Sequence, residues 1–350
     1  MSPPGCNPGA RLSATVGQEL RPAFSVIIVN YNGGDYLRRA VESLRRQTFG
    51  SFELIVFDNA STDGSLDQLD TSGFRSVMIL RSPHNVGFAS GNNRAAELAR
   101  GQWIVLLNPD TEAREDWLEK LHAAHLSNPG SRSFASAQYK LSDGTLLDGA
   151  GDAYLVFGFP WRGGFGLPAS VLPGPGRCFS ACGAAAMYDR SIFLELGGFD
   201  ERYFCYCEDV DLGYRFQLMG HDCLFVADAV VWHAGSAISG HQSSFSTFHG
   251  TRNRIWTYFK NTPALLLLLT LPVHLLLTFY VLAHNAFSPR RQPMLEGLSA
   301  GFASALRMRR SDRWRVPDRQ VSQWTLVRRM AWNPWKMHTR KPHVRPLAGP

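Results

Sequence analysis

The chain has 350 residues and can bury a large core, which favours one big domain or two fused half-domains and argues against several independent domains. Its hydrophobic content of 45% and charged content of 19% are those of a globular protein. The net charge of +7 is unevenly distributed, because residues 288–350 contain 14 Lys or Arg and 3 Asp or Glu, whereas residues 1–287 carry −4. The basic character therefore belongs to a C-terminal tail.

Residues 1–22 are rich in Pro, Gly and Ser and lack the apolar segment of a signal peptide, so we expect a disordered N-terminus and a folded part in the cytoplasm. Cysteines are expected to be reduced there. The spacings Cys178-x-x-x-Cys182 and Cys205-x-Cys207 differ from those of zinc ribbons. Buried thiols are therefore favoured over a zinc site for the six cysteines, Cys6, Cys178, Cys182, Cys205, Cys207 and Cys223.

A strand, a turn and a helix are predicted from residue 24 onward. Residues 24–29 form an apolar, β-branched run suited to a strand buried on both faces, and the turn 30–34 follows it. Asp35 is placed to cap a helix with one apolar stripe, which we expect to pack on a sheet. The stripe consists of Leu37, Val41 and Leu44.

Further strands are predicted at 53–57, 77–80 and 103–107, with a helix at 89–100 between the last two. Strands that alternate with helices imply a parallel sheet with right-handed crossovers, and such a sheet binds ligands beyond the carboxyl ends of its strands. Residues 113–235 have shorter, mixed segments and are predicted to form an α+β half that covers the first. The chemistry is expected directly after the strands, at 30–32, 58–59 and 108–110.

Asp58 ends the second predicted strand, where a carboxylate could accept a hydrogen bond from a base N–H or a ribose hydroxyl of a nucleotide. Capping of a following helix explains the same residue equally well. A dinucleotide-binding dehydrogenase would need a G-x-G-x-x-G turn after the first strand. The turn 30–34 lacks this pattern, which argues against that class.

Asp110 follows the fourth predicted strand in the segment Asn108-Pro109-Asp110. A carboxylate at such a strand end faces the ligand crevice, where a divalent cation and a diphosphate would both require an anionic partner. The same N-P-D sequence is also good turn chemistry, so a purely local role is the alternative.

Glu208 and Asp209 open a predicted helix, where acidic residues stabilise the first turn. Neighbouring carboxylates also repel each other, which raises the pKa of one of them and prepares it to act as a general base toward a hydroxyl. His233 ends the apolar run 229–232. Neutral imidazole is a common metal ligand, although a lone histidine at a strand end is more often structural.

Taken in chain order, six segments resemble glycosyltransferase family 2: FSVIIVNYNGGDYL, FELIVFDNASTDGS, NVGFASGNN, WIVLLNPDTE, GGFDERYFCYCEDVDLGYR and VVWHAG. They span residues 24–235, about three fifths of the chain, and linked motifs in order are far more specific than any single motif. The resemblance implies an inverting enzyme with the α/β GT-A fold, a mostly parallel sheet flanked by helices. Within the family, N-P-D followed by E-D-V-D-L resembles the bacterial rhamnosyltransferase-like branch, which uses thymidine-diphosphate rhamnose.

The resemblance also implies roles for single residues. Asp209, with Glu208 beside it, matches the catalytic base, and Asp110 matches the metal-binding end of the family's D-x-D motif. His233 matches a histidine that completes the metal site in some members, and the implied metal is Mg²⁺ or Mn²⁺. Because the first D of D-x-D is Asn108 here, the metal is expected to bind weakly without the donor. The implied donor-binding residues are Val29, Asn30, Tyr31, Asp58, Asn59, Asn85, Gly87, Gly91, Asn92 and Asn108.

The implied reaction moves L-rhamnose from a thymidine-diphosphate donor to a hydroxyl of a polyprenyl-diphosphate-linked glycan, in cell-surface polysaccharide or cell-wall synthesis. The alternative is a catalytically inactive nucleotide-sugar-fold subunit that scaffolds a polysaccharide assembly. The presence of Asp110, Asp209 and His233 argues against it. A nucleotidyltransferase is disfavoured because no Gly-rich phosphate loop with a following Arg and Lys is present. Residues that read the sugar are expected in loops such as 154–166.

Residues 263–286 are almost wholly apolar and long enough to cross about 30 Å of hydrocarbon. A single crossing would export the basic tail, against the positive-inside tendency, and Pro272 would kink the helix. A re-entrant or in-plane helical hairpin is therefore favoured over a single span, with a buried soluble hairpin as a further alternative. The basic tail is expected to face anionic lipids at the cytoplasmic face of the cell membrane, with RNA binding as the alternative.

The expected organisation has five parts. They are a disordered N-terminus at 1–22, a nucleotide-sugar-binding half at 23–112, an acceptor-binding and catalytic half at 113–250, a membrane-associated helical region at 251–306 and a basic tail at 307–350.

Overall fold

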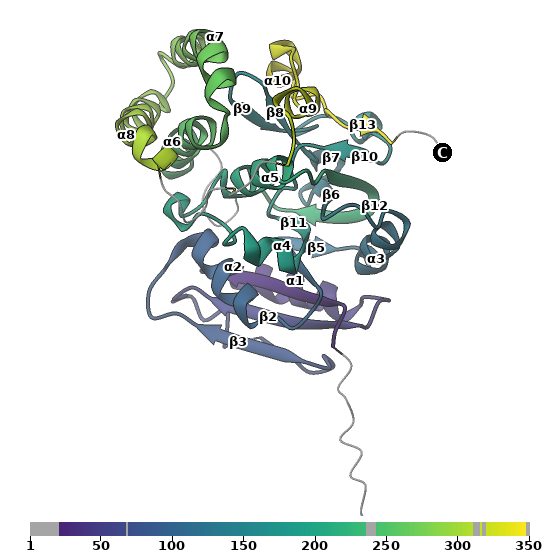
Figure 1. The fold of residues 1–350 in the computed structure, drawn as a ribbon. Coiled ribbons are helices and arrows are strands. Elements are labelled where there is room, and N and C mark those ends of the chain that lie inside the picture. Colours follow the sequence, from purple (N-terminus) through teal and green to yellow (C-terminus); the bar gives the residue numbers. More distant parts are fainter. Residues whose placement is uncertain (1–20, 68, 236–242, 311–315, 317–319, 348–350) are drawn as a thin grey trace, which may run out of the picture.

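The computed structural model describes residues 21–347, except for 68, 236–242, 311–315 and 317–319. The expectation of a disordered N-terminus therefore lies almost entirely outside the described residues. The described chain has one large mixed sheet, with helices on both sides of it and a group of helices at one end (Figure 1).

The first half of the sheet is parallel, as predicted. Strands β4 (Trp103–Leu107), β1 (Phe24–Asn30), β2 (Phe52–Asp58) and β3 (Val77–Arg81) lie side by side in that order. Every residue of β1 is buried, because its apolar side chains contact core clusters on both faces of the sheet. The crossover helices are α1 (Gly34–Arg45) and α2 (Gly87–Leu98).

Helix α1 buries the predicted stripe of Leu37, Val41 and Leu44. The expectation that Asp35 caps this helix is wrong. Gly33 occupies the cap position without a side-chain hydrogen bond, and Asp35 lies in the first turn, where its Oδ1 accepts a hydrogen bond of 2.7 Å from Arg38. The helix therefore begins two residues earlier than the sequence suggests, and its first residue, Gly34, adopts a positive φ of 50°.

The second half extends the same sheet, whereas a separate covering half was expected. Strand β11 (Ala185–Asp189) pairs antiparallel with β4 on one side and with β6 (Ser133–Lys140) on the other. Strand β12 (Cys223–His233) then pairs parallel with β6. Strands β4, β6 and β12 therefore run in one direction, and their carboxyl ends share an edge. Strands β5 (Thr111–Ala113), β7 (Asp143–Ala150), β10 (Gly176–Cys178) and β13 (Arg345–Pro346) complete the sheet.

A separate two-stranded hairpin consists of β8 (Asp152–Leu155) and β9 (Phe159–Arg162). The remaining helical segments of the described chain are α3 (Trp117–Ser127), η1 (Ala169–Val171), α4 (Arg190–Glu195), η2 (Glu201–Tyr203), α5 (Glu208–Leu218), α6 (Ser244–Asn261), α7 (Ala264–His284), α8 (Arg291–Arg310), α9 (Gln323–Arg329) and α10 (Pro334–His338). Helices α6, α7 and α8 gather at the end of the molecule opposite β3 (Figure 1).

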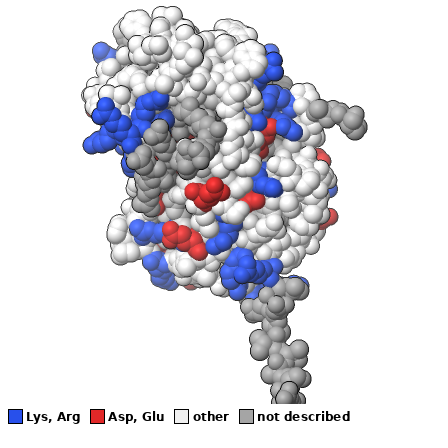
Figure 2. Space-filling model, viewed as in Figure 1, with Lys and Arg blue, Asp and Glu red and all other residues white. Residues whose placement is uncertain are grey.

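Helix α7 is, within the described residues, the one helix that is long and apolar enough to cross a membrane. Its polar and apolar sides are reversed relative to those of a helix in a soluble protein, which buries its apolar side. Its buried positions recur every fourth residue and are mostly polar, namely Leu266, Thr270, His274 and Thr278. Its exposed positions are apolar, with Leu268 70% and Leu276 66% exposed. The end of the molecule that carries α7 shows few charged side chains, and Lys and Arg flank it on both sides (Figure 2).

Two described segments of the basic tail, α9 and β13, pack on the sheet domain, which corrects the expectation that all of the tail faces lipid. Strand β13 pairs with β10 at the edge of the sheet. The buried carboxylate of Asp222 attracts Arg177, Arg329 at 3.3 Å and Arg345 at 3.2 Å. A nearly buried carboxylate is costly without cationic partners, so these arginines are held within the protein.

Candidate active site

A cavity of about 700 Å³ opens at the shared carboxyl edge of the sheet. Ten of the predicted site residues line it, namely Val29, Tyr31, Asn59, Asn85, Gly87, Asn108, Asp110, Glu208, Asp209 and His233. They come from segments up to two hundred residues apart, and the parallel course of β1, β2, β4 and β12 brings them together. Because β11 runs the other way, the residues before it, Cys182–Ala184, reach the same cavity.

Four predicted donor-binding residues, Asn30, Asp58, Gly91 and Asn92, are not among the described residues that line the cavity. Asn30 Nδ2 donates to Asp58 Oδ1 at 3.1 Å and to Ser61 Oγ at 3.0 Å, so the pair joins the ends of β1 and β2. Asp58 Oδ2 accepts from the Ser61 backbone N–H at 3.3 Å, and no helix begins there, so the helix-cap alternative is wrong. These residues support the wall of the cavity, and their contact with a donor stays a prediction.

The Asn59 side chain connects two lining segments. Its Nδ2 donates to Asn85 Oδ1 at 2.8 Å, and its Oδ1 accepts from the Val86 backbone N–H at 2.8 Å. Gly91 lies where a Cβ would come within 2.9 Å of Val29, so helix α2 can approach β1 only with glycine at this position. Both features fix the side of the cavity formed by the first half of the chain.

His233 lies between two carboxylates. Its Nε2 is 3.2 Å from Asp110 Oδ1, and its Nδ1 is 2.7 Å from Asp148 Oδ2. Strand pairing sets this geometry, because Thr111 of β5 is opposite His233 of β12 and the Ala234 N–H donates to the Asp110 carbonyl at 2.9 Å. Burial lowers the pKa of His233, but Asp110 and Asp148 outweigh it and raise the pKa to about 9.

Asp148 is also held by Arg162, whose Nη1 lies 2.6 Å from Asp148 Oδ2. Burial alone would raise the pKa of Asp148, and the charges of Arg162 and His233 lower it to about 2. Asp148 is therefore a firm anion behind the histidine. A histidine whose Nδ1–H is fixed by a carboxylate presents Nε2 to a metal, which is a common arrangement in metal sites.

Within the described residues, no group of three His, Cys, Asp or Glu side chains could hold a metal ion. Asp110 and His233 offer one carboxylate and one imidazole at the open edge of the sheet. Magnesium is often bound by one or two protein ligands together with substrate phosphates, so this pair fits a metal that arrives with a diphosphate. The pair fits a permanently bound structural metal poorly.

Helix α5 begins with Glu208 and Asp209, as predicted. Asp209 Oδ2 accepts from the Gly183 backbone N–H at 2.9 Å, which fixes the carboxylate at the cavity wall. Burial raises the pKa of Asp209, and burial together with the charge of Asp209 raises that of Glu208 well above its usual value. Positive φ angles at Phe204, Tyr206 and Cys207 bend the chain just before the helix, and strained backbone of this kind occurs mostly at functional sites.

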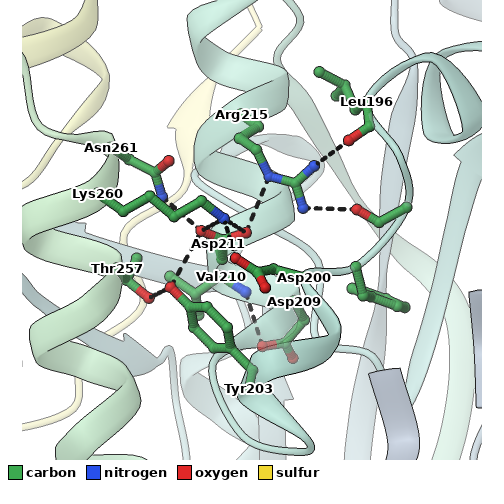
Figure 3. A network of polar contacts seen from close by, with 12 residues as sticks. Leu196, Asp200, Tyr203, Asp209, Val210, Asp211, Arg215, Thr257, Lys260 and Asn261 are labelled. Carbon is green, nitrogen blue, oxygen red and sulfur yellow. Dashed lines mark hydrogen bonds and ion pairs between the residues drawn. The ribbon is translucent and has the colours of Figure 1, made fainter. Parts of the chain in front are cut away.

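Asp211, two residues after Asp209 on α5, has a different environment. It is fully buried and accepts hydrogen bonds from Arg215, Lys260, Asn261 and Tyr203 (Figure 3). Arg215 also donates to the carbonyls of Leu196 and Gly198 at 2.8 and 2.7 Å. This network joins α5 to α6, so it fixes the helix that carries Asp209.

Sequence reasoning missed Asp148, Asp152, Arg162 and Gly183, all of which contact the predicted site or line its cavity. Asp148 and Asp152 lie in a region without a recognisable motif, and only strand pairing brings Asp148 to His233 and Asp152 to the cavity. The expectation that loop residues 154–166 contribute was the one available signal, and Pro160, Trp161 and Arg162 do line the cavity.

Comparisons with known proteins agree with this site. Residues 25–197 match the model of a family described as glycosyl transferase family 2. The chain is 27% identical over 264 residues, 66% of this chain and 85% of the relative, to N-acetylglucosaminyl-diphospho-decaprenol L-rhamnosyltransferase of Mycobacterium tuberculosis.

Two solved structures show the same fold. The mannosyltransferase of Pyrobaculum calidifontis in complex with GDP-Man and Mn²⁺ has a TM-score of 0.53 at 17% identity, covering 82% of this chain and 88% of its own. GalNAc-T7 with UDP, GalNAc and Mn²⁺ has a TM-score of 0.54 at 22% identity, covering 68% of this chain and 48% of its own. The predicted GT-A fold is confirmed.

Proposed function

We propose that the chain, a glycosyltransferase whose residues 25–197 match the model of glycosyl transferase family 2, transfers a sugar with inversion from a nucleoside-diphosphate donor to a hydroxyl acceptor. The observation that carries this proposal is that a single cavity is lined by Asp110, His233 and Asp209. Asp110 and His233 can hold a metal-bound diphosphate, and Asp209 offers a buried carboxylate to an attacking hydroxyl.

The proposed reaction is one in-line displacement. Asp209 accepts the proton of the acceptor hydroxyl while that oxygen forms a bond to the anomeric carbon. The bond from this carbon to the diphosphate oxygen breaks, and the nucleoside diphosphate leaves with the bonding electrons. The Gly183 N–H holds Asp209 in place, and burial raises the pKa of Asp209, which makes its carboxylate a stronger base than an exposed one.

Asp110 and His233 would hold a divalent ion, Mg²⁺ or Mn²⁺, with Asp148 fixing the histidine ring. When bound, this ion would supply positive charge that stabilises the leaving diphosphate. The two solved structures named above contain Mn²⁺, which supports a divalent ion. Asn108 lines the cavity beside Asp110 and contributes an amide where a full D-x-D motif has a carboxylate.

For the substrates, we propose L-rhamnose from a thymidine-diphosphate donor and a polyprenyl-diphosphate-linked glycan acceptor, in polysaccharide or cell-wall synthesis. The Mycobacterium tuberculosis relative is named as an L-rhamnosyltransferase with a decaprenol-linked acceptor, which supports the proposed sugar and the proposed acceptor. A membrane-bound acceptor also agrees with the exposed leucines of α7. We propose that the protein lies at the cytoplasmic face of the membrane, with α7 in contact with lipid.

A donor panel tests the proposed function. Thymidine-, uridine- and guanosine-diphosphate sugars are titrated into the full-length protein with Mg²⁺ in a calorimeter, and slow hydrolysis of each donor is followed by release of nucleoside diphosphate. Binding and metal-dependent hydrolysis of one donor class are expected. Binding without hydrolysis or transfer would favour the inactive scaffold, and no binding by any donor would contradict the proposal.

A further inference from the structure

The β8–β9 hairpin presents two charged side chains to the cavity. Asp152 and Arg162 are directly opposite each other in the antiparallel pairing, and both line the cavity. Residues opposite each other in such a pair have side chains on the same face. Asp152 is only 5% exposed, so its carboxylate has little contact with bulk water.

This hairpin is fixed from behind by two other parts of the chain. Asp152 exchanges backbone hydrogen bonds with Phe179 and Ser180, at 2.9 and 3.0 Å. The tail holds the strands through Ala331, which bonds to Tyr154 and Val156 at 2.9 Å each, and through the Lys341 carbonyl, which accepts from Trp161 Nε1 at 3.0 Å. A side chain on so rigid a support is preorganised for binding.

The hairpin is also connected to both groups of residues that the proposed reaction uses, the metal-binding pair and the base. On one side, Arg162 contacts Asp148, which contacts His233, which lies beside Asp110. On the other side, the charge of Asp209 raises the pKa of both Arg162 and Asp152, so the three groups interact across the cavity. In an in-line displacement, the transferred sugar lies between the diphosphate and the base. The wall formed by the hairpin is therefore the wall that a bound sugar ring would touch.

We propose that Asp152 and Arg162 bind the hydroxyl groups of the transferred sugar and so determine which sugar is accepted. This inference rests on the proposed function. The carboxylate accepts hydrogen bonds from hydroxyls and the guanidinium donates them, so the pair is complementary to neighbouring hydroxyls of a pyranose ring. Within the described residues, Arg162 donates to Asp148 through Nη1, and a guanidinium has five N–H donors, so donors remain for a ligand.

A purely structural role explains Asp152 poorly. A carboxylate with little access to water is costly, and an apolar residue of similar volume is often as stable or more so. Burial and the charge of Asp209 raise the pKa of Asp152 well above its usual value. A ligand that donates hydrogen bonds to Asp152 would offset this cost. The structure thus keeps an energetically unfavourable carboxylate at the point where a sugar would bind.

The test compares a sugar nucleotide with its bare nucleotide. Thymidine-diphosphate L-rhamnose and thymidine diphosphate are titrated with Mg²⁺ into the full-length wild type and into Asp152→Asn, Asp152→Ala and Arg162→Lys. The wild type is expected to bind the sugar nucleotide more tightly. The Asp152 variants are expected to bind thymidine-diphosphate L-rhamnose roughly 10-fold to 100-fold more weakly than the wild type, as for the loss of a hydrogen bond to a charged group. Their affinity for thymidine diphosphate is expected to be unchanged. Asp143→Asn, an exposed change on β7, is the matched control.

The outcomes separate this inference from the proposed function. Equal weakening of both ligands would show a structural role for Asp152, and unchanged binding of both would show no role, so either overturns the inference. If the wild type binds neither ligand, the thymidine donor is wrong. The comparison is then repeated with a uridine- or guanosine-diphosphate sugar that binds and with its bare nucleoside diphosphate. If no pair binds, the proposed function fails and the inference fails with it.

Discussion

The Lys260 ammonium lies 2.8 Å from Asp211 Oδ1, and both side chains are almost completely removed from water. Lys260 belongs to α6, and Asp211 belongs to the first turns of α5, two residues after Asp209 (Figure 3). Lys260 also contacts Asp200 at 2.8 Å. One cation therefore joins the helix that carries the candidate base to the helix that leads into α7.

Replacement of Lys260 by Met is expected to lower the free energy of unfolding by roughly 3 kcal/mol, because it removes the cation that the buried carboxylates of Asp200 and Asp211 share. Arg202 and Arg215 still contact these carboxylates, so the loss is expected at the low end of the cost of breaking a buried ion pair. Urea denaturation followed by circular dichroism measures this change. Lys120→Met is the matched control, because the Lys120 side chain is 41% exposed and its contact with Asp116 is long, at 3.9 Å. A change of less than about 1 kcal/mol is expected for it. Equal effects of the two substitutions would show that the buried pair contributes little.

Asp148→Asn is expected to weaken donor binding only when a divalent ion is present. The amide holds the His233 ring less firmly than the carboxylate, and loss of such a partner typically reduces metal affinity 10-fold to 100-fold, so about that loss is expected in Mg²⁺. In EDTA the variant and the wild type should bind nucleotide alike. An equal loss in both conditions would show that Asp148 supports the fold and does not act through a metal.

Asp209→Asn is expected to abolish transfer and leave donor binding nearly unchanged. General base catalysis typically contributes about 10²–10⁴-fold, and the amide keeps the size of the side chain and an oxygen that can accept from the Gly183 N–H. Transfer rates under saturating donor and calorimetric donor affinity measure the two effects separately. Asp67→Asn, at an exposed position, controls for the change of charge. Retained turnover in Asp209→Asn would remove the assignment of the base.

The dependence of the transfer rate on pH follows from the environment of Asp209. Burial raises the pKa of this carboxyl, so protonation begins at a higher pH than for an exposed aspartate. Because only the ionised form accepts a proton, activity is expected above this raised pKa and is lost as the pH falls through it. A profile of kcat against pH should therefore show its acid limb above the usual aspartate range. An acid limb within that range would contradict a buried base.

The sequence predicts the parallel half of the fold well, because its signals are local. The strand at 103–107 is confirmed at both ends, and the strand ends that place Asp110 and His233 follow from apolar runs and known topology. Asp148, Asp152 and Arg162 could not be found in this way. Their positions depend on pairings across β6, β7, β8 and β9, including register shifts between Gln138 and Lys140, which no local pattern encodes.

The C-terminal region shows the same limit. Its charge predicts attraction to anionic lipid, but the placement of Arg329 and Arg345 depends on a single distant carboxylate, Asp222. In the same way, the apolar character of α7 is plain in the sequence, whereas its polar buried side is visible only in the packing. Tyr258 on α6 contacts Thr270 at 2.8 Å, and the Phe157 carbonyl contacts His274 at 2.8 Å.

These contacts predict that α7 lies along the membrane surface and does not cross it. The polar side of α7 is hydrogen-bonded to α6 and to the β8–β9 hairpin, and both of these elements line or support the cavity. A helix that crossed the membrane would therefore draw polar parts of the enzyme into the hydrocarbon. In sealed vesicles of phosphatidylethanolamine and phosphatidylglycerol with protein added outside, protease should digest residues on both sides of α7. Protection of the basic tail would show a crossing helix.

The paired substitution Leu268→Glu with Leu276→Glu is expected to reduce vesicle binding at least about tenfold, since each change removes a side chain that is worth roughly 1.5–3 kcal/mol when buried in an apolar environment. The fold should survive, because both positions are exposed, and donor binding by the soluble variant checks this. Leu98→Glu, on the exposed side of α2 in the other half of the chain, is the matched control and should bind vesicles like the wild type. Vesicle binding that is unchanged by the pair but lost when basic residues of the tail are neutralised would show that charge, and not the leucine face of α7, holds the enzyme at the membrane.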